Sequence, residues 1–167
     1  GQLGEAIATT AGESVVWLPD STVIPDLPSG NAMSIGLWVK LPAAGGVTVF
    51  EGERNNAGIW VEQRYMSISK ASLSGESWAQ VSALSGSFLR NVFFPIDPNY
   101  LPSYTWAFVG CVFGLASWSL YLNGEKIWDQ AVGASIPAPG AISDLDINLY
   151  NGAAVDEAFA TSTALTD

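Results

Sequence analysis

Hydrophobic and polar residues alternate with a period of two in every convincing segment of the chain. Ile35, Leu37 and Val39, for example, alternate with Ser34, Gly36, Trp38 and Lys40. This period places apolar side chains on one face of a strand, whereas a helix needs a period of about 3.6. The same alternation, or a short run rich in β-branched and aromatic residues, recurs at 14–18, 46–53, 58–62, 65–69, 78–82, 88–94, 106–114, 117–122, 125–128, 146–150 and 155–160.

Ten or more short strands, with turn residues between them and no convincing helix, are typical of a sandwich or barrel. We therefore predict an all-β fold made of two antiparallel sheets. Residues 106–114 are apolar at consecutive positions, as expected of a central strand, and we expect Cys111 to be buried there. The segment 105–122 is long enough to span a bilayer, but its glycines, alternating serines and missing basic flanks favour two buried strands.

Two segments do not fit the strand pattern. Residues 1–13 are small and polar, and we predict a flexible N-terminal arm there, followed by the sandwich domain at 14–167. Residues 94–104 contain three prolines and are predicted to form a long loop. Its aromatic residues Tyr100 and Tyr104 are candidates for contacting a ligand or partner at the surface.

Asn123-Gly124 lies between two alternating segments and predicts a two-residue hairpin turn, because both positions tolerate positive φ. With this two-residue turn Leu120 faces Ile127 on the core side, and Ser119 faces Trp128. Tyr121, Lys126 and Trp128 then share the outer face and are candidates for binding a sugar ring or a partner surface. The alternative is that another loop covers the hairpin and that Trp128 belongs to the core.

Four segments, in order, resemble the laminin G-like domains of the concanavalin A-like lectin and glucanase jelly-roll superfamily. MSIGLWVKLP (33–42) is similar to the family's aromatic-V-K strand, and TWAFVGCVFG (105–114) to its W-x-x-V-A strand, with Gly110 replacing the alanine. SLYLNGEKI (119–127) resembles the lYvNG hairpin, and AVDEAFATSTALTD (154–167) resembles the closing strand and tail. The resemblance implies a two-sheet jelly roll from about residue 14 onward.

Net charge and composition exclude several functions. The chain has sixteen acidic and six basic residues, a net charge of −10, no histidine and one cysteine. Nucleic-acid binding needs clustered cations, so we expect no nucleic-acid partner. The features of segment 105–122 described above lead us to expect no membrane span. Catalytic imidazoles, intramolecular disulfides and thiolate zinc sites are also excluded.

Some jelly rolls of this superfamily are glucanases, and a retaining glycosidase needs two carboxyl groups about 5 Å apart. The related glucanases carry an E-x-D-x-x-E stretch, which this chain lacks. The pairs Glu51 with Glu53 and Asp144 with Asp146 are spaced by two, but neither has the third carboxylate. We therefore expect no enzymatic activity, and a glucanase is the least favoured of the alternatives.

Calcium is the candidate cofactor, because oxygen ligands can hold it without histidine or cysteine. Relatives of the superfamily often carry calcium near one rim, and the resemblance makes Asp144, Asp146 and Asp156 its candidate ligands. The alternative is that Asp156, in the family's D-E pair, serves turn geometry and edge hydrogen bonding.

The chain has seven tryptophans. We expect Trp17, Trp38 and Trp106 to lie in the core and leave Trp60 and Trp78 undecided. Two function classes remain. The first is a non-catalytic recognition module that binds a glycan or protein on an extracellular or virion surface. The second is a structural or decoration protein of a phage or another self-assembling particle, bound to copies of itself or to a capsid or tail partner.

Overall fold

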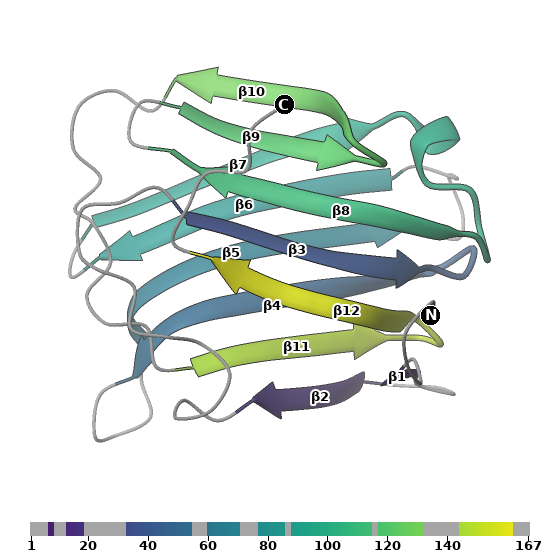
Figure 1. Ribbon diagram of the computed structural model, residues 1–167, viewed down its shortest axis with the longest axis horizontal. Helices are drawn as coiled ribbons and strands as arrows, with labels where there is room; N and C mark the ends of the chain where they lie inside the picture. Colours follow the sequence, from purple (N-terminus) through teal and green to yellow (C-terminus); the bar gives the residue numbers. More distant parts are fainter. Residues whose placement is uncertain are drawn as a thin grey trace.

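The computed structural model describes residues 7–8, 13–18, 33–54, 60–70, 77–85, 88–114, 117–131 and 144–161, and it confirms the predicted two-sheet antiparallel sandwich (Figure 1). Sheet A has the strand order β1-β12-β3-β8-β9-β10, and sheet B has the order β2-β11-β4-β5-β6-β7. The strands are β1 (Ile7–Ala8), β2 (Glu13–Leu18), β3 (Met33–Lys40), β4 (Gly45–Arg54), β5 (Trp60–Lys70), β6 (Ser77–Ser85), β7 (Phe88–Ile96), β8 (Trp106–Phe113), β9 (Ser117–Leu122), β10 (Glu125–Ala131), β11 (Asp144–Tyr150) and β12 (Ala154–Thr161).

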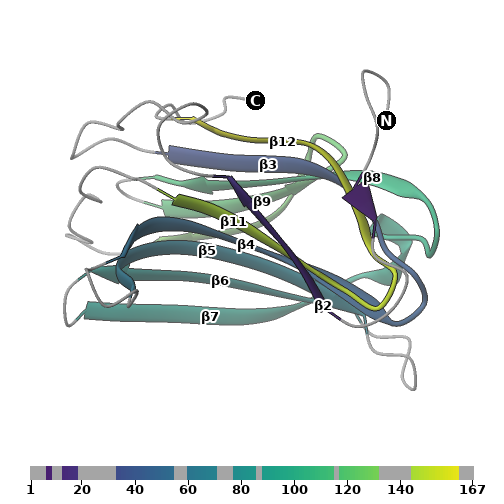
Figure 2. The same cartoon turned by 90° about the horizontal axis from the view of Figure 1, so that it is seen from below.

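The two sheets form separate layers, with β3 and β12 in one and β4 to β7 in the other (Figure 2). Helical structure in the part of the chain described is limited to one 3-10 turn, Pro98–Tyr100. No helix there is long and apolar enough to cross a membrane.

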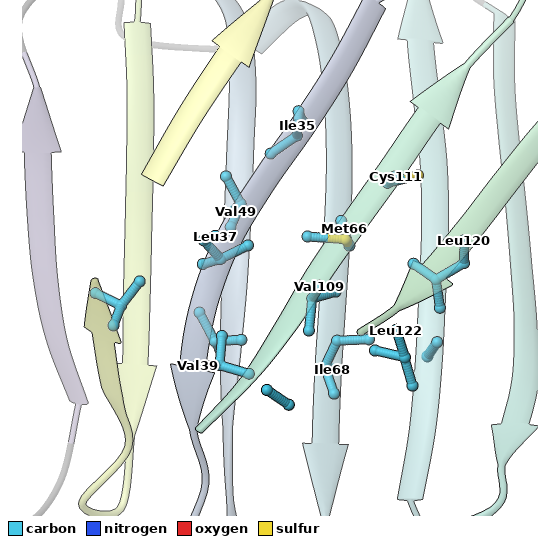
Figure 3. Packing of buried hydrophobic residues seen from close by; sticks show 14 of the residues in the cluster. Ile35, Leu37, Val39, Val49, Met66, Ile68, Val109, Cys111, Leu120 and Leu122 are labelled. Carbon is cyan, nitrogen blue, oxygen red and sulfur yellow. The ribbon is translucent and has the colours of Figure 1, made fainter. Parts of the chain in front are cut away.

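The core lies between the sheets and consists of the apolar positions that the alternation predicts. Leu37, Val109 and Leu120 from sheet A face Met66 and Ile68 from sheet B, and all are fully buried (Figure 3). Burial of each such side chain contributes about 1.5–3 kcal/mol, which makes this layer the main source of stability. Cys111 lies in the same layer and is buried, as predicted.

Strand β5 corrects two boundaries predicted from the sequence. The sequence predicts separate strands at 58–62 and 65–69, and a strand at 46–53 that ends at Glu53. Instead, β5 runs without a break through Glu62 and Tyr65, and β4 continues to Arg54. The reason is long-range pairing, because β5 forms ladders with both β4 and β6 over most of its length.

The Asn123-Gly124 turn is confirmed, with φ angles of 53° and 85°. Glu125 pairs with Leu122 and Lys126 with Tyr121, as predicted. Beyond Lys126 the predicted register is wrong, because a β-bulge shifts it so that Trp128 pairs with Leu120 instead of Ser119. A bulge adds one residue to one strand and thereby reverses the face on which the following side chains lie.

Two residues of the predicted N-terminal arm belong to sheet A. Ile7 pairs with Val155 and Ala8 with Ala154 at the edge of the sheet. Strand β2 starts at Glu13, one residue before the predicted start of the domain. The other residues of 1–12 lie outside the described part of the chain, and the mobility of the arm stays a prediction.

Candidate functional site

The outer face of sheet B carries two rows of side chains that run across the strands. In the first row Tyr150 lies opposite Gly46, Gly46 opposite Ser69, and Ser69 opposite Trp78. The four residues come from β11, β4, β5 and β6. Small residues therefore separate two aromatic residues along this row.

The second row is polar over most of its length. Thr48 lies opposite Ser67, Ser67 opposite Gln80, and Gln80 opposite Phe93 on β7. Phe93 is also a diagonal neighbour of Trp78, whose direct partner is Pro95. Diagonal neighbours on one sheet face lie within reach of each other's aromatic rings.

Two hollows lie along these rows. One, of about 260 Å³, is lined by Ser67, Ser69, Trp78, Ala79, Gln80 and Phe93. The other, of about 400 Å³, is lined by Gly45, Gly46, Thr48, Ser67, Ile68, Ser69, Lys70, Tyr150 and Asn151. Because they share Ser67 and Ser69, they form one depression, which we call the sheet B groove.

Exposed aromatic rings form one end of the sheet B groove. Trp78 is 40% exposed and Phe93 is 63% exposed. At Gly46, a Cβ atom would lie 2.8 Å from the carbonyl oxygen of Ile68, so the backbones approach too closely for a side chain here. The groove thus stays open between Tyr150 and the Trp78–Phe93 end.

The floor of the groove carries hydroxyl and amide groups. Thr48 Oγ1 and Ser67 Oγ lie 2.9 Å apart and share a hydrogen bond. The Tyr65 hydroxyl donates to Gln80 Oε1, which orients the amide. Burial raises the pKa of Tyr65, which strengthens the preference of this phenol for its protonated, hydrogen-donating form. These contacts hold the polar groups of the floor in place before any ligand arrives.

Lys70 is the charged residue among those that line the groove. Its buried ammonium donates to the carbonyl oxygen of Leu101 at 2.7 Å and to Ser103 Oγ at 2.8 Å. Desolvation lowers the pKa of Lys70. The ammonium therefore anchors the loop between β7 and β8, and it is directed away from the groove.

Trp128 is not on the outer face, which corrects the predicted binding set. The bulge in β10 turns its ring toward the interior, where it stacks on Phe94 with ring centroids 4.5 Å apart. Tyr121 and Lys126 do come together on the outer face of sheet A, with Lys126 Nζ 5.6 Å from the centre of the Tyr121 ring. The alternative reading of Trp128, as part of the core, is thus the one that the packing supports.

The two loop tyrosines have different surroundings. Tyr100 packs against the core, and its hydroxyl donates to Glu125 Oε1 at 2.8 Å. This hydrogen bond raises the pKa of Tyr100. Tyr104 is 69% exposed with a φ of 61°, and its N–H donates to the carbonyl oxygen of Leu41. Tyr100 therefore joins the loop to the hairpin. Tyr104, in contrast, projects from the loop into solvent.

The expectation that Trp106 lies in the core is wrong, because this residue is only partly buried and Lys40 Nζ lies 5.3 Å from the centre of its ring. Trp38 is likewise not in the core. It is 36% exposed on the outer face of sheet A, where it contacts Phe108 edge to face, and Phe108 stacks on Phe159. The fully buried tryptophan of the described residues is Trp118. The signal was present in the alternation, because Leu37 and Val39 on either side of Trp38 are core residues.

The candidate calcium ligands lie on strands of different sheets. Asp144 pairs with Gly52 and Asp146 with Phe50 in sheet B, whereas Asp156 pairs with Trp38 in sheet A. Asp156 Oδ1 accepts a hydrogen bond from the N–H of Glu157 at a bulge, as the turn-geometry alternative expects. Among the residues described, no three His, Cys, Asp or Glu side chains gather to hold a metal ion. The side chains of Asp144 and Asp146 lie outside that set, and calcium stays a prediction.

The acidic pairs considered for hydrolysis occupy alternating positions of the β4–β11 ladder. Glu51 pairs with Leu145, whereas Asp144 and Asp146 pair with the residues on either side of Glu51. Residues directly opposite each other share a face of the sheet, and successive residues alternate between faces. The backbone register therefore does not align Glu51 with Asp144 and Asp146.

No protein-family model and no curated protein sequence matches the chain. Its fold does match solved structures. Mouse laminin α1 chain domains LG4-5 align with a TM-score of 0.61 and 10% identity, covering 95% of this chain and 41% of that one. The carbohydrate-binding module CBM66 from Bacillus subtilis aligns with a TM-score of 0.52 and 9% identity, covering 92% of this chain and 84% of that one. The Caenorhabditis elegans galectin LEC-6 aligns with a TM-score of 0.53 and 13% identity, covering 92% of this chain and 95% of that one.

A structure described as a native glycosidic hydrolase also matches, with a TM-score of 0.56 and 9% identity over 95% of this chain and 81% of that one. The matched proteins thus include both binding modules and a hydrolase, and a shared fold does not decide between them. What they establish is the architecture: the chain has the concanavalin A-like jelly-roll fold that its resemblance to laminin G-like domains predicted.

Proposed function

We propose that the chain is a non-catalytic module that binds a glycan through the sheet B groove, on an extracellular surface. The observation that carries this proposal is the position of two exposed aromatic rings, Trp78 and Phe93, beside a floor of hydroxyl and amide side chains. Exposed aromatic residues that lie together beside an organised polar floor mark a binding site more often than a solvated surface.

The chemistry of the groove matches that of a sugar. A pyranose ring has faces of C–H groups, which pack on aromatic rings, and a rim of hydroxyls, which exchange hydrogen bonds with groups such as Thr48, Ser67 and Gln80. Aromatic platforms also bind nucleic-acid bases, but the net charge of −10 opposes a phosphate backbone. A glycan therefore fits the groove better than a nucleic acid does.

The similar structures support the proposal by analogy, since their descriptions name a carbohydrate-binding module and a galectin. Glycoside hydrolysis would require two carboxyl groups at the bound sugar. The residues that line the groove are aromatic, small, hydroxyl, amide and aliphatic residues together with Lys70, and none of them is acidic. The groove is therefore suited to holding a sugar and not to cleaving it.

A structural role in a self-assembling particle is the second candidate. The observation that favours it is the aromatic cluster of Trp38, Phe108 and Phe159 on the outer face of sheet A, because protein contact surfaces are enriched in aromatic residues. If this cluster joins copies of the chain, the mass in solution exceeds that of one chain, and Trp38→Ala restores the mass of a monomer. A monomeric wild-type protein would rule out self-assembly through this cluster.

A variant that closes the groove tests the glycan proposal. Ser69 is exposed in the middle of the groove, so Ser69→Tyr fills the open space without disturbing the core. Ser69→Ala is the matched control, because it removes the hydroxyl and leaves the groove open. On a glycan array, the wild type and Ser69→Ala should retain the same glycans, and Ser69→Tyr should retain none. Equal retention by all three proteins would show that sugars bind elsewhere.

A further inference from the structure

We infer that the ligand of the sheet B groove is an uncharged oligosaccharide that lies across the strands and contacts two aromatic platforms, Trp78 and Tyr150. The inference rests on the proposed function and adds the length, the direction and the charge of the ligand. It depends on the arrangement of the two platforms, on the turn that follows Tyr150 and on the charges around the groove.

The two platforms lie at opposite ends of one straight row. Tyr150 on β11 and Trp78 on β6 are separated by Gly46 on β4 and Ser69 on β5. Neighbouring strands are about 4.8 Å apart, so three steps place the platforms about 14 Å from each other. A single sugar ring is too short to contact both. The hollows at the two ends share Ser67 and Ser69 as lining residues, so a chain of sugars that spans these residues would contact both hollows.

The Tyr150 end of the groove is held by a tight turn. Asn151 and Gly152 follow with φ angles of 54° and 87°, and the N–H of Ala153 donates to the carbonyl oxygen of Tyr150 at 3.2 Å. Asn151 also lines the hollow beside Tyr150. An aromatic ring and an amide on a two-residue turn form a second, pre-organised contact region for a ligand.

The charges around the sheet B groove favour an uncharged ligand. The lining residues contribute one cation, Lys70, whose ammonium is engaged by Leu101 and Ser103 in the loop. The chain as a whole carries a net charge of −10 and repels polyanions. A glycan with sulfate or carboxylate groups would approach against this field. Among the described residues that line the groove no cation is directed at it, so an uncharged chain is favoured.

Immobilised oligosaccharides of increasing length, from monosaccharides to hexasaccharides, test the inference in uncharged and sulfated forms. The wild type should bind the uncharged series, with an affinity that rises until the chain reaches both platforms. Trp78→Ala should weaken binding at every length. Tyr150→Ala should weaken binding of the longest chains about tenfold and leave the shortest bound chain unaffected. Tyr150→Phe keeps the ring and should retain the rise of affinity with length that Tyr150→Ala loses.

The possible results separate this inference from the proposed function. If the wild type binds neither series, both fail. If the affinity does not depend on length, if Tyr150→Ala weakens all lengths equally, or if sulfated chains bind best, this inference fails and the glycan proposal stands. Far-UV circular dichroism and a melting curve for each variant identify any protein that has not folded, and Tyr150→Phe then tests the platform against a hydroxyl contact.

Discussion

The indole of Trp128 stacks on the phenyl ring of Phe94, with the ring centroids 4.5 Å apart and the planes within 8° of parallel. Trp128 belongs to β10 and Phe94 to β7, the edge strands of sheet A and sheet B. The pair therefore joins the two sheets along the side of the sandwich at which both end.

This contact predicts that Trp128→Ala destabilises the fold. The ring is partly buried and stacked, so its truncation should lower the free energy of unfolding by about 2 kcal/mol. Urea denaturation measures the change, and Tyr104→Ala is the control, because a 69% exposed ring should contribute less than about 0.5 kcal/mol. Equal stability of Trp128→Ala and the wild type would contradict the assigned packing.

Cys111 is predicted to be unreactive in the native protein. The thiol is completely buried, and desolvation raises its pKa far above the usual range, so almost no thiolate forms at neutral pH. A thiol reagent should label it only after the addition of denaturant. Cys111→Ser should lower the free energy of unfolding by about 1–3 kcal/mol, because it buries a hydroxyl among apolar groups. Rapid labelling without denaturant would argue against a central position for β8.

The hairpin turn predicts a purely conformational effect at Gly124. Its φ is 85°, and no atom lies within 4 Å of the position that a Cβ would occupy. Gly124→Ala should therefore lower the free energy of unfolding by about 1 kcal/mol through backbone strain alone. Asn123→Ala should add a second loss, because Asn123 Oδ1 accepts a hydrogen bond from the N–H of Phe108. Unchanged melting of Gly124→Ala would be inconsistent with the positive φ.

The lowered pKa of Lys70 predicts how the free energy of unfolding depends on pH. Desolvation lowers its pKa in the folded protein below the ordinary value of 10.5. In the window between these two values the unfolded chain binds more protons, so the contribution of Lys70 to stability rises as the pH increases toward 10.5. The free energy of unfolding of the wild type, measured relative to Lys70→Met, should increase over this window. If the free energies of unfolding of the wild type and of Lys70→Met changed in parallel with pH, burial would not lower the pKa of Lys70.

The features predicted correctly from the sequence are those determined within a few residues. Asn123-Gly124 specifies its own backbone conformation, and the alternation of Ile35, Leu37 and Val39 identifies the core face of β3. The bulge after Lys126 was missed, because it depends on the stacking of Trp128 on Phe94 from a strand of the other sheet.

The sheet B groove was missed for a similar reason. Tyr150 is far from Gly46 in the chain and becomes its neighbour only when β11 pairs with β4. Ser69 and Trp78 join the same row through the pairing of β4 with β5 and of β5 with β6. Part of the signal was nevertheless present, because Trp78 alternates with Ala79 and Val81, which are both buried. That alternation places Trp78 on the outer face, where the sequence alone left it undecided.

The most direct test of a glycan site on sheet B compares two tryptophans of similar exposure on opposite faces of the molecule. Trp78 is 40% exposed in the sheet B groove, and Trp38 is 36% exposed on the outer face of sheet A. Titration calorimetry with a glycan that the wild type retains should show that Trp78→Ala binds at least about tenfold more weakly, while Trp38→Ala binds as the wild type does. Lost binding in Trp38→Ala, with Trp78→Ala unaffected, would contradict the account and assign the site to sheet A.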